Sequence, residues 1–213
     1  RAVFCLPDYG FDPSEAAVPF TFLMEKGVEC TIATQTGKSP VCDRRMIEGW
    51  TGSLLGAKAA ARVAYAQFAA SDTFKTPLAW TSPEFSLLDY DAVILPGGHD
   101  KGVKQIIEDE VLRTKLRDFF PLTEGEEPSK VCGAICHGVL ILAWTKDASG
   151  EHSVLYNRRT TTLPIHLERL AVYGTGLVLG DYYRTYAGTW TAKEVVQALK
   201  TPEQYSPGPF NFS

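Results

Sequence analysis

The sequence predicts an α/β fold built on a mostly parallel sheet, and two observations carry this prediction. Short apolar runs of strand length alternate with segments of helical pattern, which is typical of βαβ units. Hydrophobic residues make up 45% of the 213 residues, which is enough for a full core and excludes a disordered chain. The length suits a single domain over residues 1–213 that carries a sizeable insertion.

The strand and helix patterns can be placed along the chain by their lengths and by their flanking Gly and Pro residues. The predicted strands are 2–6, 28–34, 91–95 and 130–135, and 153–155 and 184–187 are further strand candidates. The predicted helices are 12–26, 102–120, 137–146 and 191–200.

About sixty residues separate the second and third strands, too many for one simple crossover. Within them, 54–70 is alanine-rich and helical in pattern, and Trp50, Phe74, Trp80 and Phe85 flank or follow it. We interpret 43–85 as a helical insertion that caps one end of the sheet. The alternative is a second crossover helix with a long loop.

The composition limits the classes of binding partner that we expect for this protein. The net charge of -4, with scattered basic residues, gives no footprint for nucleic acid, and no apolar run reaches the roughly 20 residues that span a bilayer. The N-terminus reads as a first core strand rather than a signal peptide, and the lack of an initiator Met leads us to expect that a few residues are missing. Five cysteines without a disulfide spacing indicate a reduced, cytoplasmic protein. We therefore expect a small-molecule substrate.

The most informative segment is an apolar run that ends abruptly at a cysteine. Its sequence is Val131-Cys132-Gly133-Ala134-Ile135-Cys136-His137-Gly138. This order predicts a strand, a sharp turn and a helix with Cys136 at the tip, the arrangement of a nucleophile elbow. A thiol at a helix N-terminus is expected to favour the thiolate form. The alternative interpretation is that Cys136 is a small core residue.

Glu15 has two interpretations as well. Asp12 and Glu15 have the spacing of a helix capping box, with Pro13 at the first helical position, and this structural role would suffice. The functional interpretation is that Glu15 points at Cys136, hydrogen-bonds the sulfur and moves a proton.

Other candidates lie where ligands collect, at the carboxyl ends of parallel strands. Gly97 and Gly98 either form a plain tight turn or bring backbone N–H groups to a substrate oxygen, together with the N–H of His137. His99 is an alternative base or a substrate-binding group.

His137 is the candidate base, but because it directly follows Cys136 it could instead cap the new helix. Glu168 or Asp181 could orient it. No pair among the Cys, His and Glu candidates has the spacing of a zinc motif, so we predict no metal site. No dinucleotide or P-loop motif is present, so we predict no cofactor.

Taken together, these motifs resemble the ThiJ/PfpI superfamily, which has the class I glutamine amidotransferase-like fold. The matching segments are Asp12-Pro13-x-Glu15-x-x-x-Pro19, Leu95-Pro96-Gly97-Gly98-His99 and Ala134-Ile135-Cys136-His137-Gly138. The Cys-His-Gly form and the insertion are most similar to the chaperone-glyoxalase branch, and 179–186 resembles a less studied group of bacterial and fungal members.

The resemblance implies a flavodoxin-like three-layer sandwich with Cys136 as nucleophile and Glu15 paired to its sulfur. It implies oxyanion N–H donors at Gly98 and His137, and a Cys-His-acid triad whose acid we map to Glu168. Homodimers are common in the superfamily, so a homodimer is implied.

Three functions follow as hypotheses. The first is a cofactor-independent, cysteine-dependent lyase or hydrolase on a small electrophilic carbonyl compound, with glutathione-independent glyoxalase chemistry as the nearest named example. The second is an oxidative-stress sensor in which peroxide oxidises Cys136. The third is a holdase chaperone, which needs an exposed apolar patch, with Trp50, Phe74 and Trp80 as candidates.

Overall fold

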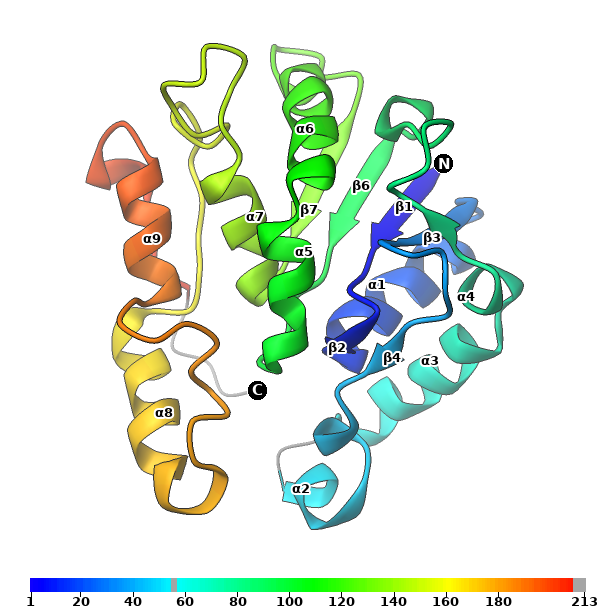
Figure 1. Cartoon of the computed structure of the whole chain (residues 1–213), viewed down its shortest axis with the longest axis vertical. Coiled ribbons are helices and arrows are strands. Elements are labelled where there is room, and N and C mark those ends of the chain that lie inside the picture. Colours follow the sequence, from blue (N-terminus) through cyan, green and yellow to red (C-terminus); the bar gives the residue numbers. More distant parts are fainter. Residues whose placement is uncertain (55–56, 209–213) are drawn as a thin grey trace.

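The computed structural model describes residues 1–54 and 57–208. Its centre is a parallel five-stranded sheet of order β5-β3-β1-β6-β7 (Figure 1). The strands are β1 (Ala2–Cys5), β3 (Cys30–Thr34), β5 (Leu78–Ala79), β6 (Ala92–Leu95) and β7 (Val131–Ala134). A small parallel pair, β2 (Tyr9–Phe11) and β4 (Val41–Cys42), continues beyond the carboxyl ends. The mostly parallel α/β fold is confirmed.

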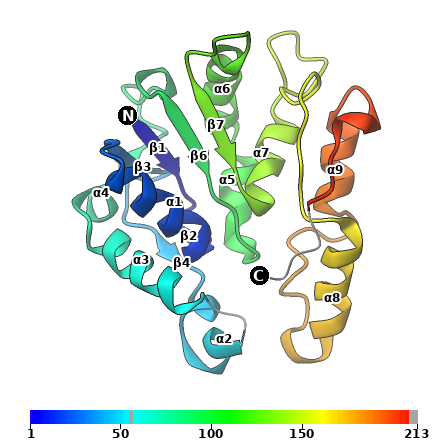
Figure 2. The ribbon, with the colours of Figure 1, turned by 180° about the vertical axis from the view of Figure 1, so that it is seen from behind.

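Helices cover both faces of the sheet (Figures 1 and 2). One face packs against α1 (Pro13–Glu25), α3 (Ala59–Ala70) and α4 (Asp72–Lys75). The other packs against α5 (Lys104–Glu108), α6 (Glu110–Phe119), α7 (Val139–Trp144) and α9 (Thr191–Ala198). Successive side chains of β1 point to opposite faces of the sheet, so this strand contributes to the cores on both faces. Ala2 and Phe4 belong to the first core, against α1, α3 and α4, and Val3 and Cys5 belong to the second core, against α5, α6, α7 and α9.

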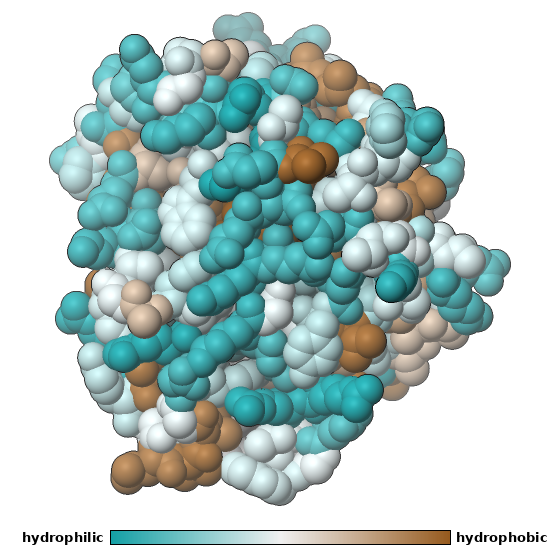
Figure 3. All heavy atoms as spheres, in the orientation of Figure 1, coloured by the Kyte–Doolittle hydropathy of each residue, from teal (hydrophilic) through white to brown (hydrophobic). Residues whose placement is uncertain are grey.

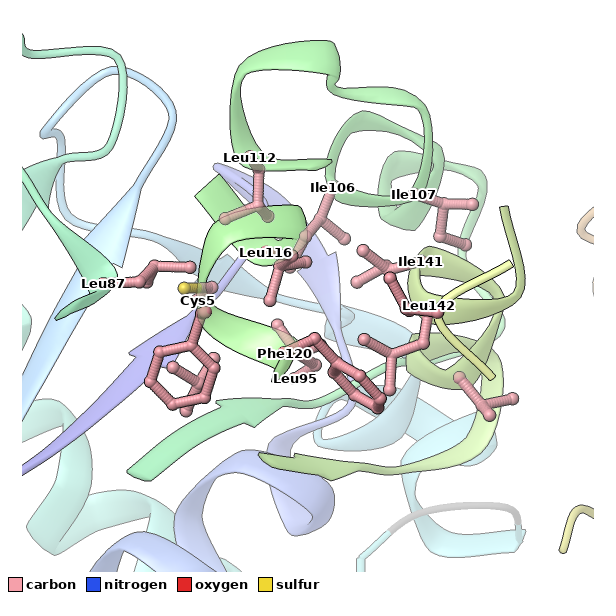
Figure 4. Packing of buried hydrophobic residues seen from close by; sticks show 14 of the residues in the cluster. Cys5, Leu87, Leu95, Ile106, Ile107, Leu112, Leu116, Phe120, Ile141 and Leu142 are labelled. Atoms are coloured by element: carbon pink, nitrogen blue, oxygen red, sulfur yellow. The ribbon is translucent and has the colours of Figure 1, made fainter. Parts of the chain in front are cut away.

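The second core anchors the helix that follows the predicted elbow. Figure 4 shows Ile106 and Leu116 from α5 and α6 facing Ile141 and Leu142 of α7. All four lie in one buried cluster with Cys5 and Leu95 of the sheet, and each large apolar side chain contributes about 1.5–3 kcal/mol when fully buried. The start of α7 is thereby fixed against β6 and β7.

The segment 43–85 contains both a crossover and a projecting part. Helix α3 packs on α1, and β5 joins the sheet beside β3. Helix α2 (Gly49–Leu54) projects at the carboxyl end of the sheet (Figure 1). Of the flanking aromatics, Phe74, Trp80 and Phe85 are buried in the two cores, and Trp50 is exposed. The three buried rings therefore belong to the cores rather than to a pocket or an exposed patch.

Several element predictions are wrong in detail. The helix over 102–120 is divided at Asp109, whose carboxylate accepts the backbone N–H of Leu112 and starts α6. The candidate strand 153–155 makes only an isolated bridge from Ser153 to Lys146, and 184–187 is not a strand. The sequence prediction also missed α8 (Ile165–Leu179), a helix beside the carboxyl end of the sheet.

None of the helices in residues 1–54 and 57–208 has the length and apolarity needed to cross a membrane. Parts of the predicted domain and insertion, at 55–56 and 209–213, lie outside the described residues.

Candidate active site

Cys136 lies at a sharp turn between β7 and α7, and its backbone has φ +53°. Within the described part of the chain it is the only residue other than glycine with positive φ. A non-glycine residue held in this region costs on the order of 1–3 kcal/mol, which the surrounding structure must supply. The geometry is that of the predicted elbow, and it places Cys136, a half-buried residue, at the carboxyl edge of the sheet.

Two glycines allow the elbow to press against the loop after β6. A Cβ on Gly138 would lie 2.1 Å from the carbonyl oxygen of Leu95, and one on Gly97 would lie 2.7 Å from the nitrogen of His137. Both values are far below van der Waals contact. The backbone N–H of Gly97 donates to the Glu15 carboxyl at 2.9 Å. The Gly97 N–H is therefore occupied by Glu15, and the N–H of His137 is hydrogen-bonded to the Cys136 side chain.

The capping box predicted for Asp12 and Glu15 is only half formed. The Asp12 carboxylate accepts the backbone N–H groups of Ser14 and Glu15, at 2.7 and 3.2 Å, as a helix cap should. The N–H of Asp12, however, donates to the carbonyl of Gly97 at 2.9 Å instead of to Glu15. The Glu15 carboxyl is thereby left to meet Gly97 and to hydrogen-bond the side chain of Cys136. The structure thus brings Glu15 and Cys136 together.

The pKa values of Glu15 and Cys136 are both raised. Burial, followed by the charge of Asp12, raises the pKa of Glu15 to about 8. Burial, followed by the negative charges of Glu15 and Asp12, raises the pKa of Cys136 well above its ordinary value, although the backbone N–H of His137 lowers it. The expected thiolate is therefore not favoured, because burial and two carboxyl groups outweigh the helix terminus.

His137 touches Cys136 although it directly follows it in sequence. Its Nδ1 lies 3.4 Å from the Cys136 sulfur, and its Nε2 lies 3.9 Å from a carboxylate oxygen of Glu168. The second distance is too long for a hydrogen bond. Burial, followed by the neighbouring His99, lowers the pKa of His137 to about 3, so the ring is neutral near pH 7 and can accept a proton.

Glu168 is placed by α8 and held by the N-terminus of α9. It accepts the backbone N–H of Thr191 at 3.0 Å and the Thr191 hydroxyl at 3.0 Å. Burial raises the pKa of Glu168, and the Thr191 hydrogen bonds lower it. Asp181, the alternative partner for His137, is instead exposed and paired with Lys101. The structure therefore selects Glu168 as the acid beside His137.

His99 packs edge-on against His137, with ring centroids 5.2 Å apart, and against Tyr183 at 4.7 Å. Burial lowers the pKa of His99 to about 4. Ligand atoms of His99, Cys136 and His137 all lie within 4.8 Å of one another. The predicted site residues on both loops therefore form one cluster.

Sequence reasoning missed two contributors. Thr191 holds Glu168, and its position at the start of a predicted helix was the signal, since such termini attract carboxylates. Tyr182 donates a hydrogen bond to Asp43 at 2.5 Å, which ties the segment after α8 to the segment before α2. No pattern in the sequence pairs these two distant residues.

The space around the cluster is small. A cavity of about 10 Å³ borders His137, Glu168 and Tyr183, which is room for about one water molecule. A larger groove of about 550 Å³ follows the outer edge of β7 and includes Cys132. None of the clustered acid and base groups lines this groove.

The comparisons with known proteins show the family of the chain. The model of the ThiJ/PfpI family-like group matches residues 6–209. The chain belongs to the ThiJ/PfpI-like family. Two uncharacterized proteins of Schizosaccharomyces pombe are similar to it, one 26% identical over 164 residues and one 25% identical over 177 residues. Each match covers 77% of this chain, but only 59% and 55% of those relatives, so the chain spans less than two thirds of their length.

Solved members of similar fold cover nearly the whole chain. The Francisella tularensis Rapid Encystment Protein of 24 kDa has a TM-score of 0.68 and 19% identity, over 100% of this chain and 86% of that protein. Glyoxalase III from Candida albicans has a TM-score of 0.63 and 15% identity, over 99% of this chain and 83% of that protein. At these identities the likeness shows the fold alone.

Proposed function

We propose that this ThiJ/PfpI-like protein is a cysteine-dependent enzyme that acts on a small electrophilic carbonyl compound, in the manner of a glyoxalase III. One observation carries the proposal: Cys136 sits on a strained elbow with a neutral imidazole 3.4 Å from its sulfur and a carboxyl group hydrogen-bonded to it. Nucleophile, base and acid are therefore all within reach of one reacting atom. The fold likeness to a protein named glyoxalase III agrees with this proposal.

With methylglyoxal, the first step forms a bond between the Cys136 sulfur and the aldehyde carbon. The thiol proton passes through Nδ1 of His137 to the aldehyde oxygen, which gives a neutral hemithioacetal. In this proposal the backbone N–H groups of Gly98 and His137 stabilise that oxygen while it carries negative charge. The raised pKa of the thiol makes this coupled transfer necessary, since little free thiolate is present at rest.

The second step isomerises the hemithioacetal, so that the carbonyl group moves from the ketone carbon to the former aldehyde carbon. His137 removes the hydrogen from the former aldehyde carbon while Glu15, protonated because its pKa is about 8, gives a proton to the ketone oxygen. His137 then returns its proton to the neighbouring carbon, and Glu15 recovers one from the first oxygen. The product is a lactyl thioester on Cys136. The Glu168 carboxylate stabilises the transient imidazolium.

Water completes the cycle. It attacks the thioester carbon, His137 takes its proton, the carbon–sulfur bond breaks, and the proton returns to the Cys136 sulfur. Methylglyoxal and water thus become lactic acid without oxidant, reductant or cofactor. The site residues suffice for each proton transfer.

The other two hypotheses have less support. A peroxide sensor depends on a stabilised thiolate, whereas burial and two carboxyl groups raise the pKa of Cys136. The holdase hypothesis named Trp50, Phe74 and Trp80 as an apolar patch, but Phe74 and Trp80 are buried.

The test is turnover of methylglyoxal by the purified protein, followed as loss of dicarbonyl and formation of lactate. Cys136→Ser should abolish turnover, and Cys132→Ser is the matched control that should keep it. If the wild-type protein produces no lactate, and also leaves glyoxal and other small aldehydes unchanged, the proposal is wrong. Stoichiometric oxidation of Cys136 by low peroxide in the same preparation would then favour the sensor.

A further inference from the structure

The cluster at the elbow contains three soft or borderline ligand atoms from two separate loops. The Cys136 sulfur, a His137 ring nitrogen and a His99 ring nitrogen lie within 4.8 Å of one another, and Sγ of Cys136 lies 3.4 Å from Nδ1 of His137. Tetrahedral zinc with bonds of about 2.3 Å to sulfur and about 2.0–2.1 Å to nitrogen places such a pair about 3.5 Å apart. The Cys136–His137 pair therefore already has the spacing of two zinc ligands.

His99 can complete three-fold coordination with a small movement. It lies on the loop after β6, packed edge-on against His137. Closing the 4.8 Å spread to about 3.5 Å needs a ring shift of about 1 Å, within the range of a side-chain torsion. His137 is buried, whereas His99 and Cys136 are half-buried, so the three ligand atoms face one another at the edge of the core.

The surroundings of His137 have the form found around metal-binding histidines. Nδ1 faces the sulfur, while Nε2 on the opposite side of the ring lies 3.9 Å from Glu168. A ligating histidine commonly donates its other ring N–H to a carboxylate, which fixes the tautomer and the ring orientation. Glu168 is itself held by the backbone and hydroxyl of Thr191. A metal on Nδ1 would thus have the Glu168 carboxylate on the far side of the ring, where a shortening of the 3.9 Å distance would form this hydrogen bond.

We propose that Cys136, His137 and His99 form a binding site for Zn²⁺ or a similar transition-metal ion, with the fourth position left to water. When the sulfur–metal bond forms, the Cys136 sulfur–hydrogen bond breaks and the proton passes to solvent. No electron is transferred. Because the same sulfur is the proposed nucleophile, bound metal and electrophile exclude each other, and zinc inhibits the proposed reaction.

The spacing rules applied to the sequence do not detect such a site. His99 lies 37 positions before Cys136 (136 − 99 = 37), and His137 is adjacent to Cys136. Zinc motifs are recognised by pairs a few residues apart, whereas here the sheet brings two loops together.

The experiment measures metal binding without substrate, so its result does not depend on the proposed turnover. Zn²⁺ is titrated against the whole protein in competition with a chromophoric chelator, and alkylation of Cys136 is followed in parallel. Co²⁺ serves as a spectroscopic probe, because a thiolate ligand gives a sulfur-to-cobalt charge-transfer band. We expect one ion per chain, protection of Cys136 from alkylation, and a cobalt–thiolate band.

Variants separate this site from adventitious binding. Cys136→Ser should lose the cobalt band, and His99→Phe, which keeps the ring but no nitrogen, should weaken zinc affinity at least about tenfold. Glu168→Gln should weaken it by about 10–100-fold through the loss of outer support. Matched controls are Cys132→Ser and His152→Gln, since His152 stacks on Tyr156 away from the cluster. Equal affinity in His99→Phe and His152→Gln, or no protection of Cys136, would overturn the proposal. Thermal unfolding without metal checks that each variant is folded.

Discussion

The two carboxyl groups that flank the Cys136–His137 pair belong to differently built parts of the chain. Glu15 lies half-buried in the first turn of α1, hydrogen-bonded to the Gly97 backbone and to the cysteine. Glu168 lies on α8, whose outer face leaves Leu170, Tyr173 and Leu177 exposed. Figure 3 shows hydrophobic residues gathered at the lower left, where α8 ends in Figure 1. The Glu15 side of the site is therefore part of the folded core, whereas the Glu168 side lies on a helix with few buried side chains.

This difference predicts on which side of the site a substitution should reduce stability and on which side it should mainly reduce activity. Changes on the Glu15 side alter the packing of two backbone loops and should affect stability as well as chemistry. Changes on the Glu168 side should affect chemistry more than stability, because α8 contributes few fully buried side chains. The predictions below test this division.

The largest expected effect is at the elbow itself. Cys136→Ser should lower kcat/KM for a dicarbonyl substrate by at least about 10³-fold, since it removes the nucleophile. Cys132→Ser, four residues earlier, should change kcat/KM by less than about tenfold, because burial raises the pKa of Cys132 to about 12 and the residue lines the groove along β7. Steady-state kinetics with both variants decide the point. Equal losses in the two variants would show that the thiol chemistry is not localised at the elbow.

Gly138→Ala should destabilise the protein by about 3 kcal/mol or more. The added Cβ would sit 2.1 Å from the Leu95 carbonyl oxygen, so either the elbow or the loop after β6 must move. Urea unfolding monitored by tryptophan fluorescence measures the change in unfolding free energy. A loss below about 1 kcal/mol would mean that the two loops are not pressed together.

The two carboxyl groups should differ in kinetics. Glu15→Gln should lower kcat by about 10² or more, because it removes a group that exchanges protons with substrate and sulfur. Glu168→Gln should lower kcat by about tenfold, since its carboxylate acts from 3.9 Å on the imidazolium. A pH profile of kcat/KM separates the two roles: only Glu15→Gln should remove the limb near pH 8. A larger loss in Glu168→Gln would reverse the comparison.

Stability should depend on pH through the same groups. His137 and His99, with pKa values of about 3 and 4 in the folded state and 6.5 unfolded, bind protons more readily when unfolded, so stability rises with pH up to about 6.5. Glu15, with a pKa of about 8 folded and 4.5 unfolded, keeps its proton when folded, so it opposes this rise from about pH 4.5 and lowers stability up to about pH 8.

From pH 6.5 to 8 the Glu15 contribution should cost up to about 2 kcal/mol. Thermal unfolding across this range should show a decline in wild type and a flatter profile in Glu15→Gln. An equal decline in both proteins would place the Glu15 pKa near its ordinary value.

The smallest effect is expected on α8. Gly174→Ala should stabilise the protein by up to about 1 kcal/mol, because the nearest atom to a new Cβ is a Leu170 methyl at 4.0 Å and alanine favours a helix. Thermal unfolding measures it. A destabilisation would show that this part of α8 is covered more closely than the structure indicates.

Sequence reasoning found the sheet-borne half of the site because each feature lies at a strand end. Cys136 and His137 follow β7 and Gly97 follows β6 within a few residues, and Glu15 follows the short strand β2 at the start of α1. Helix α8 was missed because Gly174 and Gly176 lie within it, and each glycine costs a helix about 1 kcal/mol. The protonation of Cys136 was also missed, because it depends on burial among Glu15 and Asp12, which no local pattern encodes.

The peptide groups around Gly97 are hydrogen-bonded on both sides by the start of α1. The Gly97 N–H donates to the Glu15 carboxyl, and the Gly97 carbonyl accepts the N–H of Asp12. A single backbone amide proton is thus attached to the titrating group beside the cysteine. In a ¹⁵N-correlated NMR spectrum the Gly97 resonance should shift as Glu15 ionises near pH 8. It should shift again when Cys136 is alkylated or bound by metal, so one glycine signal reports the chemical state of the whole elbow.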